Sequence, residues 1–245
     1  YLWLVYLQLN SCHARHTYKE RIPESWTIRY RNLRFKVSPT GFKHTGLFPE
    51  QAANWDFLMD QIEQAHREIR VLNLFAYTGG ATMACAAAGA KEVVHVDAAK
   101  GMVQWAKENM VLSHLEDRKI RFIVDDVLKF VEREKRRGRT YHGIIMDPPS
   151  YGRGPKGEIW KIEEQLYPLV SACMDILDEQ PLFFLINSYT TGFPASVLQN
   201  ILNTTVKKRH PQGRIEAGEI GLPITGSDMV LPCGIYGRWV HDPNA

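Results

Sequence analysis

The run Val71-Leu72-Asn73-Leu74-Phe75-Ala76-Tyr77-Thr78-Gly79-Gly80 joins a short apolar segment to a turn that contains two glycines. We predict a buried strand at residues 71–75 and a helix rich in small residues from about Thr82 to Ala88. Glycines permit tight backbone conformations and let a ligand approach the backbone closely. The run therefore predicts the first strand, turn and helix of a ligand-binding parallel sheet.

Short apolar segments alternate with helical patterns along the rest of the chain, which is typical of a sheet covered by helices. The other predicted strands are residues 93–97, 120–124, 141–146 and 182–187. The predicted helices are residues 50–69, 101–112, 127–137 and 163–177, with a basic, strand-like segment at 26–37 and a closing hairpin at 213–240. The pattern predicts an α/β fold with a doubly wound, mostly parallel sheet.

The chain has 245 residues, of which 44% are hydrophobic, and this suffices for one sizeable core. We expect a small extension that is strand-rich and basic at residues 1–45 and one catalytic domain at 46–245. The formal net charge of +3 is too small to indicate nucleic-acid binding by itself. A nucleic-acid-binding surface would therefore have to come from a local cluster of basic residues.

The four cysteines are far apart and form no CxxC pair, so neither a zinc site nor a disulfide framework is expected. This usage fits a reducing cytoplasm, and no metal is expected. The apolar segment Tyr1 to Leu9 is too short to span a membrane and is interpreted as a strand or capping segment.

Acidic residues follow the predicted strands at the edge where parallel sheets bind ligands. Asp97 lies about 20 residues after the glycine turn, where an acidic side chain accepts hydrogen bonds from ribose hydroxyls. The helix after the turn offers free N–H groups to a carboxylate. Because the GxGxxG pattern is missing, a dinucleotide cofactor, and with it a nicotinamide dehydrogenase, is a weaker alternative. Asp126 is a candidate for binding adenine, with Asp125 as its rival and a helix N-cap as its structural alternative.

Asp147-Pro148-Pro149 ends the fourth predicted strand. The prolines keep Asp147 and Pro148 extended, with their carbonyl oxygens free. An amine or amide nitrogen can donate to the Asp147 carboxylate and the Pro148 carbonyl, and this would aim its lone pair at the methyl group of a sulfonium. Tyr151 can stack on a flat base. The structural alternative is a proline-rich turn that only ends a strand.

A carbon target would need a nucleophilic cysteine near this cluster. None lies between Asp147 and Leu166 or between Asn187 and Gly192. Cys85 and Cys173 lie in helical patterns and are expected in the core, which leaves Cys233 as the remaining candidate in a loop.

These motifs together resemble the class I S-adenosylmethionine-dependent methyltransferases, in particular the branch that modifies large-subunit ribosomal RNA. The string from Phe75 to Gly80 and the segment Thr40-Gly41-Phe42-Lys43-His44-Thr45-Gly46-Leu47-Phe48-Pro49-Glu50-Gln51 are specific to that branch. The resemblance covers roughly Ser38 to Val240 and implies a Rossmann-like, mostly parallel, seven-stranded sheet with S-adenosyl-L-methionine as the cofactor.

The resemblance also implies roles for individual residues. Phe48 and Gln51 approach the cofactor from the N-terminal side, Tyr77 to Gly80 hold its methionine end, Asp97 its ribose and Asp126 its adenine. The full set of candidate cofactor-binding residues is Phe48, Gln51, Phe75, Tyr77, Thr78, Gly79, Gly80, Asp97, Ala98, Asp125 and Asp126. The candidate catalytic residues are Asp147, Pro148, Pro149 and Tyr151.

The sequence differs from that branch in two ways. We find no RNA-binding module of the kind that begins some members, and the stretch from Asn187 to Gly192 lacks the cysteine of the members that methylate carbon 5 of cytosine. We therefore expect a ribosomal RNA methyltransferase with a nitrogen target. The basic, aromatic segment from Trp26 to Lys43 is its candidate RNA contact, or else an ordinary surface strand with buried aromatics. A methyltransferase of a small molecule or protein, and a noncatalytic module that binds S-adenosylmethionine or RNA, remain alternatives.

Overall fold

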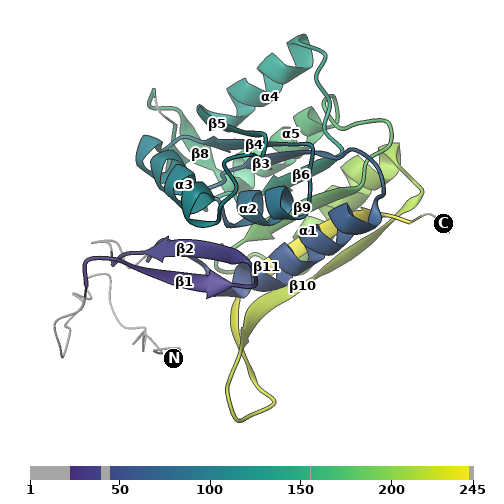
Figure 1. Cartoon of the computed structure of the whole chain (residues 1–245). Coiled ribbons are helices and arrows are strands. Elements are labelled where there is room, and N and C mark those ends of the chain that lie inside the picture. The colour runs from purple at the N-terminus through teal and green to yellow at the C-terminus, as the bar shows by residue number, and fades with distance from the viewer. Residues whose placement is uncertain (1–22, 40–44, 155, 243–245) are drawn as a thin grey trace.

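The computed structural model describes residues 23–39, 45–154 and 156–242. Its centre is a seven-stranded sheet with the strand order β10-β11-β9-β6-β3-β4-β5 (Figure 1). The interpretations given above for Tyr1 to Leu9 and for residues 40–44 lie outside the described residues, as does Cys12, the first of the four cysteines.

Five neighbouring strands of this sheet are parallel, and two antiparallel strands complete one edge. Because β3 lies between β4 and β6, the strand order reverses between β3 and β6, and this is where open α/β sheets bind their ligands. The parallel strands are β3 (Arg70–Leu74), β4 (Glu92–Asp97), β5 (Ile120–Val124), β6 (Gly143–Met146) and β9 (Phe183–Ser188). The predicted closing hairpin is confirmed as β10 (Gly213–Pro223) and β11 (Val230–His241), and it extends beyond the body of the molecule in Figure 1.

Helices cover both faces of the sheet because the apolar residues of each strand alternate between two cores. Val71 contributes to the core under α1 (Ala52–Gln64) and α2 (Gly80–Ala87), beside which lies α3 (Lys100–Leu112). Leu72 contributes to the opposite core, under α4 (Val127–Arg136), α5 (Ile162–Cys173) and α6 (Ala195–Leu202). The predicted doubly wound α/β fold is confirmed. No helix in the described part of the chain is long and apolar enough to cross a membrane.

Several predicted element bounds were wrong. The helix expected at residues 50–69 begins as the short 3-10 helix η1 (Pro49–Gln51), and α1 ends at Gln64, close to His66 with its left-handed φ of 50°. The helix expected to reach Leu177 ends at Cys173. Sequence reasoning also missed α6 and the π-helix η2 (Asn203–Lys207) that follows it.

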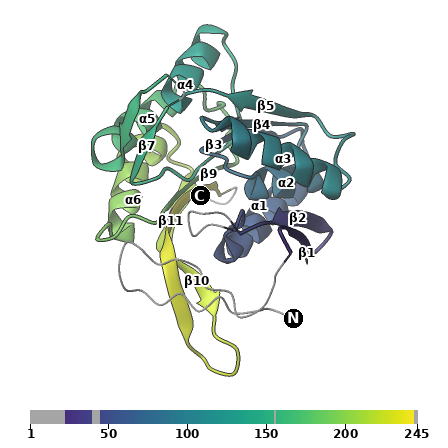
Figure 2. The same ribbon diagram turned by 90° about the vertical axis from the view of Figure 1, so that its left-hand side faces the viewer.

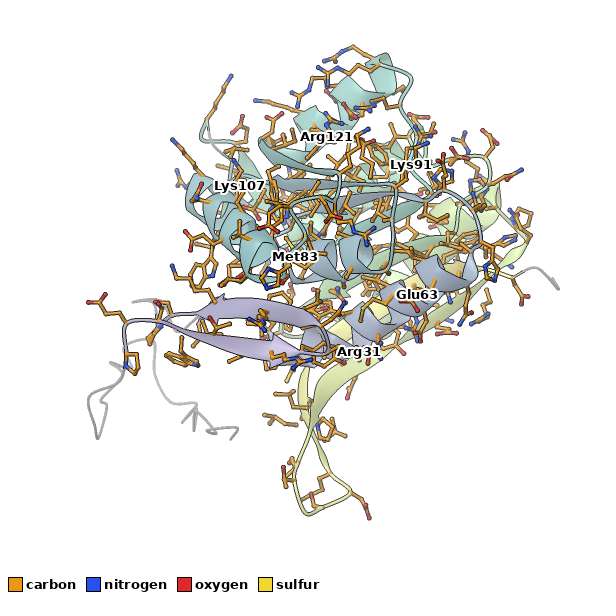
Figure 3. The ribbon with its side chains drawn as sticks, in the orientation of Figure 1. Arg31, Glu63, Met83, Lys91, Lys107 and Arg121 are labelled. Atoms are coloured by element: carbon orange, nitrogen blue, oxygen red, sulfur yellow. The ribbon has the colours of Figure 1, made fainter. Side chains whose placement is uncertain are left out.

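The basic segment at residues 26–37 is a hairpin of β1 (Trp26–Tyr30) and β2 (Leu33–Val37). Leu33 and Phe35 are fully buried in the core that α1 and α2 cover, so the hairpin shares the core of the sheet. Arg31, in the turn of the hairpin, pairs with Asp56 of α1 at 2.9 Å (Figure 3). The division of the chain at residue 45 stays a prediction.

Asn109 of α3 joins three separate parts of the fold. The side chain is completely buried, and its Oδ1 accepts from the Lys36 N–H of β2 at 2.8 Å. Its Nδ2 donates to the Thr78 carbonyl in the glycine turn at 2.9 Å. One amide therefore fixes the N-terminal hairpin and the turn to the same helix.

Replacing Asn109 with Ala should lower the free energy of unfolding by about 2–4 kcal/mol, because a buried N–H and a buried carbonyl lose their partners. Chemical denaturation measures this loss. Asn200→Ala, on the exposed side of α6, is the matched control and should change stability by less than about 0.5 kcal/mol. Equal effects of the two substitutions would contradict the role given to Asn109.

Candidate functional site

The turn between β3 and α2 contains unusual backbone conformations. Phe75, Tyr77 and Gly79 have φ angles of 54°, 50° and 86°, although only glycine adopts the left-handed region without strain. Three hydrogen bonds hold the turn: Ala76 N–H to the Val96 carbonyl (3.1 Å), Tyr77 N–H to Asp97 Oδ2 (2.8 Å) and Gly79 N–H to the Ala76 carbonyl (2.9 Å). Backbone strain that is fixed in this way is typical of ligand-binding turns.

Asp97, the last residue of β4, connects this turn to the next loop. Its Oδ1 accepts from the Ala99 N–H at 2.8 Å, while its Oδ2 holds Tyr77. Burial raises the pKa of Asp97, and the two N–H groups oppose this rise. Each carboxylate oxygen can accept more than one hydrogen bond, so Asp97 retains acceptor capacity for a ligand. Ala98, between these contacts, is partly buried.

A chain of hydrogen bonds supports the turn from below. Asn73 Nδ2 donates to Thr82 Oγ1, which lies 3.0 Å from Nδ1 of the completely buried His95. Burial lowers the pKa of His95 to about 3, so the ring is neutral at physiological pH. Because Thr82 already accepts from Asn73, its hydroxyl is free to donate to His95 Nδ1. The side chains of Asn73, Thr82 and His95 that support the turn are therefore all uncharged.

Because the glycines have no side chains, the turn packs directly against its neighbours and leaves the start of α2 accessible. A Cβ on Gly80 would lie 2.6 Å from the Trp55 ring of α1. Gly79 is the N-cap of α2, and no side chain caps the helix in the described structure. The N–H groups of its first turn are therefore available to an anion, as a methionine carboxylate would require.

The segment from Thr45 to Gln51 lies over the same turn. The Gly46 carbonyl accepts from the Thr78 hydroxyl at 2.7 Å, so this hydroxyl could only accept a hydrogen bond from a ligand. The Phe48 ring lies 5.6 Å from the ring of Tyr77 and 5.4 Å from that of Tyr189. Gln51 Nε2 donates to the Tyr189 hydroxyl at 2.7 Å. The fold thus brings Phe48 and Gln51 beside the predicted cofactor turn.

Sequence reasoning missed a polar cluster on the other side of this segment. Asn54 Nδ2 donates to Gln51 Oε1 and to Asn187 Oδ1, at 2.9 Å in both cases. Tyr189 follows directly after β9, and the buried Glu50 carboxylate lies beside its hydroxyl. The sequence contains a signal for this cluster, because residues 187–189 end a strand at the ligand-binding edge of the sheet.

Asp147 follows β6, across the strand reversal from the glycine turn. Its N–H donates to the Leu74 carbonyl at 3.4 Å. Burial and the nearby Glu50 carboxylate raise the pKa of the partly exposed Asp147 side chain to about 7. The Pro148 carbonyl has no hydrogen-bond partner among the described residues, whereas the Pro149 carbonyl accepts from Trp160 Nε1 at 2.7 Å. The two acceptors of the predicted nitrogen clamp are therefore present next to each other.

Three candidates have structural partners of their own, and a fourth is exposed. Asp126 is the N-cap of α4, because its Oδ1 accepts from the Lys129 N–H at 3.0 Å. Asp125 pairs with Arg133 at 2.6 Å. The Phe75 ring packs edge-on against Trp160, with 4.8 Å between the ring centroids. Tyr151 is half exposed at the start of the short strand β7 (Tyr151–Arg153).

The cysteines in the described residues offer no activated thiol. Cys85 and Cys173 are completely buried, which confirms their predicted place in the core. Burial and the nearby Glu50 carboxylate raise the pKa of Cys233, which disfavours the thiolate. No three His, Cys, Asp or Glu side chains of residues 23–39, 45–154 and 156–242 are grouped so that they could hold a metal ion.

Comparisons with known proteins give a family and several relatives for this chain. Residues 10–163 match the model of the S-adenosylmethionine-dependent methyltransferase family. Ribosomal RNA large subunit methyltransferase K/L of Shewanella frigidimarina is 31% identical over 159 residues, and its counterpart in Shewanella oneidensis is 34% identical over 139 residues. These matches cover 64% and 57% of this chain but only 21% and 18% of the relatives. The chain thus spans about a fifth of their length.

A solved structure gives a longer match. The SAM-dependent methyltransferase from Agrobacterium tumefaciens superposes with a TM-score of 0.86 and 38% sequence identity. The superposition covers 91% of this chain and 72% of the other. The match therefore spans most of this chain.

The raised pKa of Asp147 predicts a dependence of stability on pH. In the unfolded chain the carboxyl group titrates near 3.8, so between about pH 4 and 7 the unfolded chain ionises while the folded protein keeps Asp147 protonated, and stability falls as the pH rises. Asp147→Asn should therefore melt at a higher temperature than the parent chain, by about 2–6 °C above pH 7 and by almost nothing at pH 4.

Thermal unfolding across this pH range measures the difference. Asp60→Asn, on the exposed face of α1, is the control and should show no comparable trend. A difference for Asp147→Asn that does not change with pH would show that Asp147 has an ordinary pKa.

Proposed function

Because the chain belongs to the S-adenosylmethionine-dependent methyltransferase family, we propose that it methylates a nitrogen atom of a base in ribosomal RNA. The observation that carries this proposal is the position of Asp147-Pro148-Pro149. It follows β6, directly across the strand reversal from the strained turn after β3. Cofactor turn and acceptor cluster therefore flank one ligand-binding point of the sheet.

The described residues fit the cofactor. S-adenosylmethionine supplies a methyl group on a positively charged sulfonium. The open N-terminus of α2 and the turn from Tyr77 to Gly80 suit its methionine carboxylate, and Asp97 suits the ribose hydroxyls. Asp126 and Asp125 lie at the end of the adjacent strand β5, on the side proposed for adenine. The carboxylates of the buried Glu50 and the partly exposed Asp147 would favour the cationic end of the cofactor at the same site.

The acceptor cluster of Asp147 and Pro148 suits a target nitrogen that carries hydrogen. A base amine would donate to the Asp147 carboxylate and to the Pro148 carbonyl, which fixes the direction of its lone pair. Because the pKa of Asp147 is about 7, its carboxylate is also a suitable acceptor for the proton that the nitrogen loses after methylation. Carbon-5 chemistry is disfavoured, since Cys233 has a raised pKa and donates to the Leu231 carbonyl at 3.4 Å.

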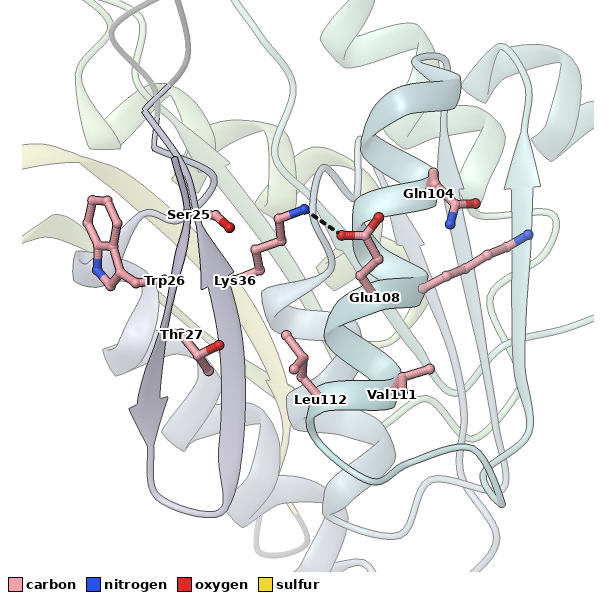
Figure 4. A pocket seen from close by; sticks show the side chains of 9 residues that line it. Ser25, Trp26, Thr27, Lys36, Gln104, Glu108, Val111 and Leu112 are labelled. Carbon is pink, nitrogen blue, oxygen red and sulfur yellow. Dashed lines mark hydrogen bonds and ion pairs between the residues drawn. The ribbon is translucent and has the colours of Figure 1, made fainter. Parts of the chain in front are cut away.

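The choice of ribosomal RNA is supported by the names of the relatives and by basic surface residues. The hairpin β1–β2 was the first candidate contact, but much of it has a structural role. Phe35 is buried and Lys36 pairs with Glu108 at 2.8 Å beside a hollow of about 500 Å³ (Figure 4). The Trp26 side chain is 40% exposed and remains the best candidate for an RNA contact in the hairpin β1–β2. We also propose a cytoplasmic location, on the ground of this proposed substrate alone.

The proposal is tested by labelled methyl transfer to ribosomal RNA from a strain that lacks the gene. The parent chain should label the RNA, and mass spectrometry of the digested nucleosides should find the methyl group on nitrogen. Asp147→Ala should lower turnover by about 100-fold or more while it retains affinity for S-adenosylhomocysteine.

Cys233→Ser is the control and should transfer methyl groups at nearly the parent rate. Loss of activity in Cys233→Ser with retention in Asp147→Ala would establish carbon chemistry instead. Labelling of protein or small molecules but of no ribosomal RNA would contradict the proposed substrate.

A further inference from the structure

We propose that the outer face of the hairpin formed by β7 (Tyr151–Arg153) and β8 (Ile159–Lys161) holds the unpaired RNA next to the target base. This inference rests on the proposed function and adds the surface that recognises the substrate. The register pairs Tyr151 with Lys161, Gly152 with Trp160 and Arg153 with Ile159. Because neighbouring strand residues face opposite sides, Tyr151, Arg153, Ile159 and Lys161 share one face, and all four are exposed.

The inner face attaches this hairpin to both halves of the site. Trp160 is buried, its Nε1 donates to the Pro149 carbonyl at 2.7 Å, and its ring packs on Phe75 of the cofactor turn. A Cβ on Gly152 would lie only 3.3 Å from Pro149 Cγ, so the strand rests directly on the proline cluster. The hairpin also pairs with α4 through Lys129 and Glu158, and Figure 2 shows β7 beside α5.

The outer face offers the groups that bind unpaired RNA. Tyr151 and Ile159 each keep 53% exposure, and an exposed aromatic ring is a platform on which a base can stack. The Arg153 guanidinium has no ion pair or hydrogen bond to any other described residue, and the same is true of the Lys156 ammonium in the hairpin loop. These two cations are therefore free to bind phosphates. Lys161 pairs with Glu164 at the surface, where the pair contributes little.

Size and position favour RNA over a protein on this face. Two three-residue strands present far less than the roughly 800 Å² that each partner buries in a standard protein interface. The face begins two residues after Pro149, so a nucleotide stacked on Tyr151 would be a near neighbour of a base at Asp147. In the hairpin β1–β2, by contrast, Arg31 and Lys36 already have carboxylate partners.

The experiment measures binding of a fluorescent, single-stranded RNA of mixed sequence by anisotropy at several salt concentrations. Tyr151→Ala should weaken binding by about 5- to 100-fold through loss of stacking, and Tyr151→Phe should retain most of the affinity because it keeps the ring. The double variant Arg153→Gln/Lys156→Gln should reduce the salt slope by about 1.4, since each phosphate contact to a single strand contributes roughly 0.7.

The matched control is Arg136→Gln/Lys208→Gln, which removes the same charge from two exposed cations outside this hairpin. It should leave the slope nearly unchanged, and all variants should bind S-adenosylhomocysteine and unfold like the parent chain. If the parent chain binds and methylates RNA but the hairpin variants behave like the control, the assigned surface is wrong. If the parent chain neither binds nor methylates RNA, the proposed function itself fails.

Discussion

The hydrogen bond from the Tyr77 N–H to the Asp97 carboxylate holds together the ends of β3 and β4, and the site is arranged around it. Left-handed backbone at Phe75 and Tyr77 costs about 1–2 kcal/mol per residue, and a hydrogen bond to a charged group returns about 1.5–3 kcal/mol. The contact between Asn109 and Thr78 adds a second anchor. With the turn fixed in this way, the N-terminus of α2 stays open on one side and Asp97 keeps acceptor capacity on the other.

Asp147 differs from Asp97, because no hydrogen-bond donor or cation among the described residues stabilises its charge. Burial and Glu50 both disfavour the carboxylate, so the protein gives up stability at the position where a target nitrogen would bring hydrogen-bond donors. A strained turn and a destabilised carboxylate thus face each other across the strand reversal. Such local costs are expected at functional sites, where the surrounding core supplies the compensating stability.

Much of this arrangement could be predicted from the sequence because its signals are local. A glycine turn after an apolar strand and acidic residues at strand ends indicate the ligand-binding edge without any knowledge of long-range contacts. The contribution of Tyr189 was not predictable in this way, since its partner Gln51 lies 138 positions away. Asn109 interrupts a helical apolar pattern, and a single polar residue does not reveal that it joins three segments. Similarly, α1 ends near a left-handed His66, which periodicity does not indicate.

We propose that one site, formed by the turn at Tyr77 to Gly80 and by Asp147, binds S-adenosylmethionine and directs its methyl group to the substrate. A crystal structure with S-adenosylhomocysteine tests this claim most directly. We expect the ribose hydroxyls on Asp97, the methionine carboxylate at the N-terminus of α2 and the sulfur atom facing Asp147. A ligand whose sulfur points away from Asp147, or which binds elsewhere on the molecule, would contradict it.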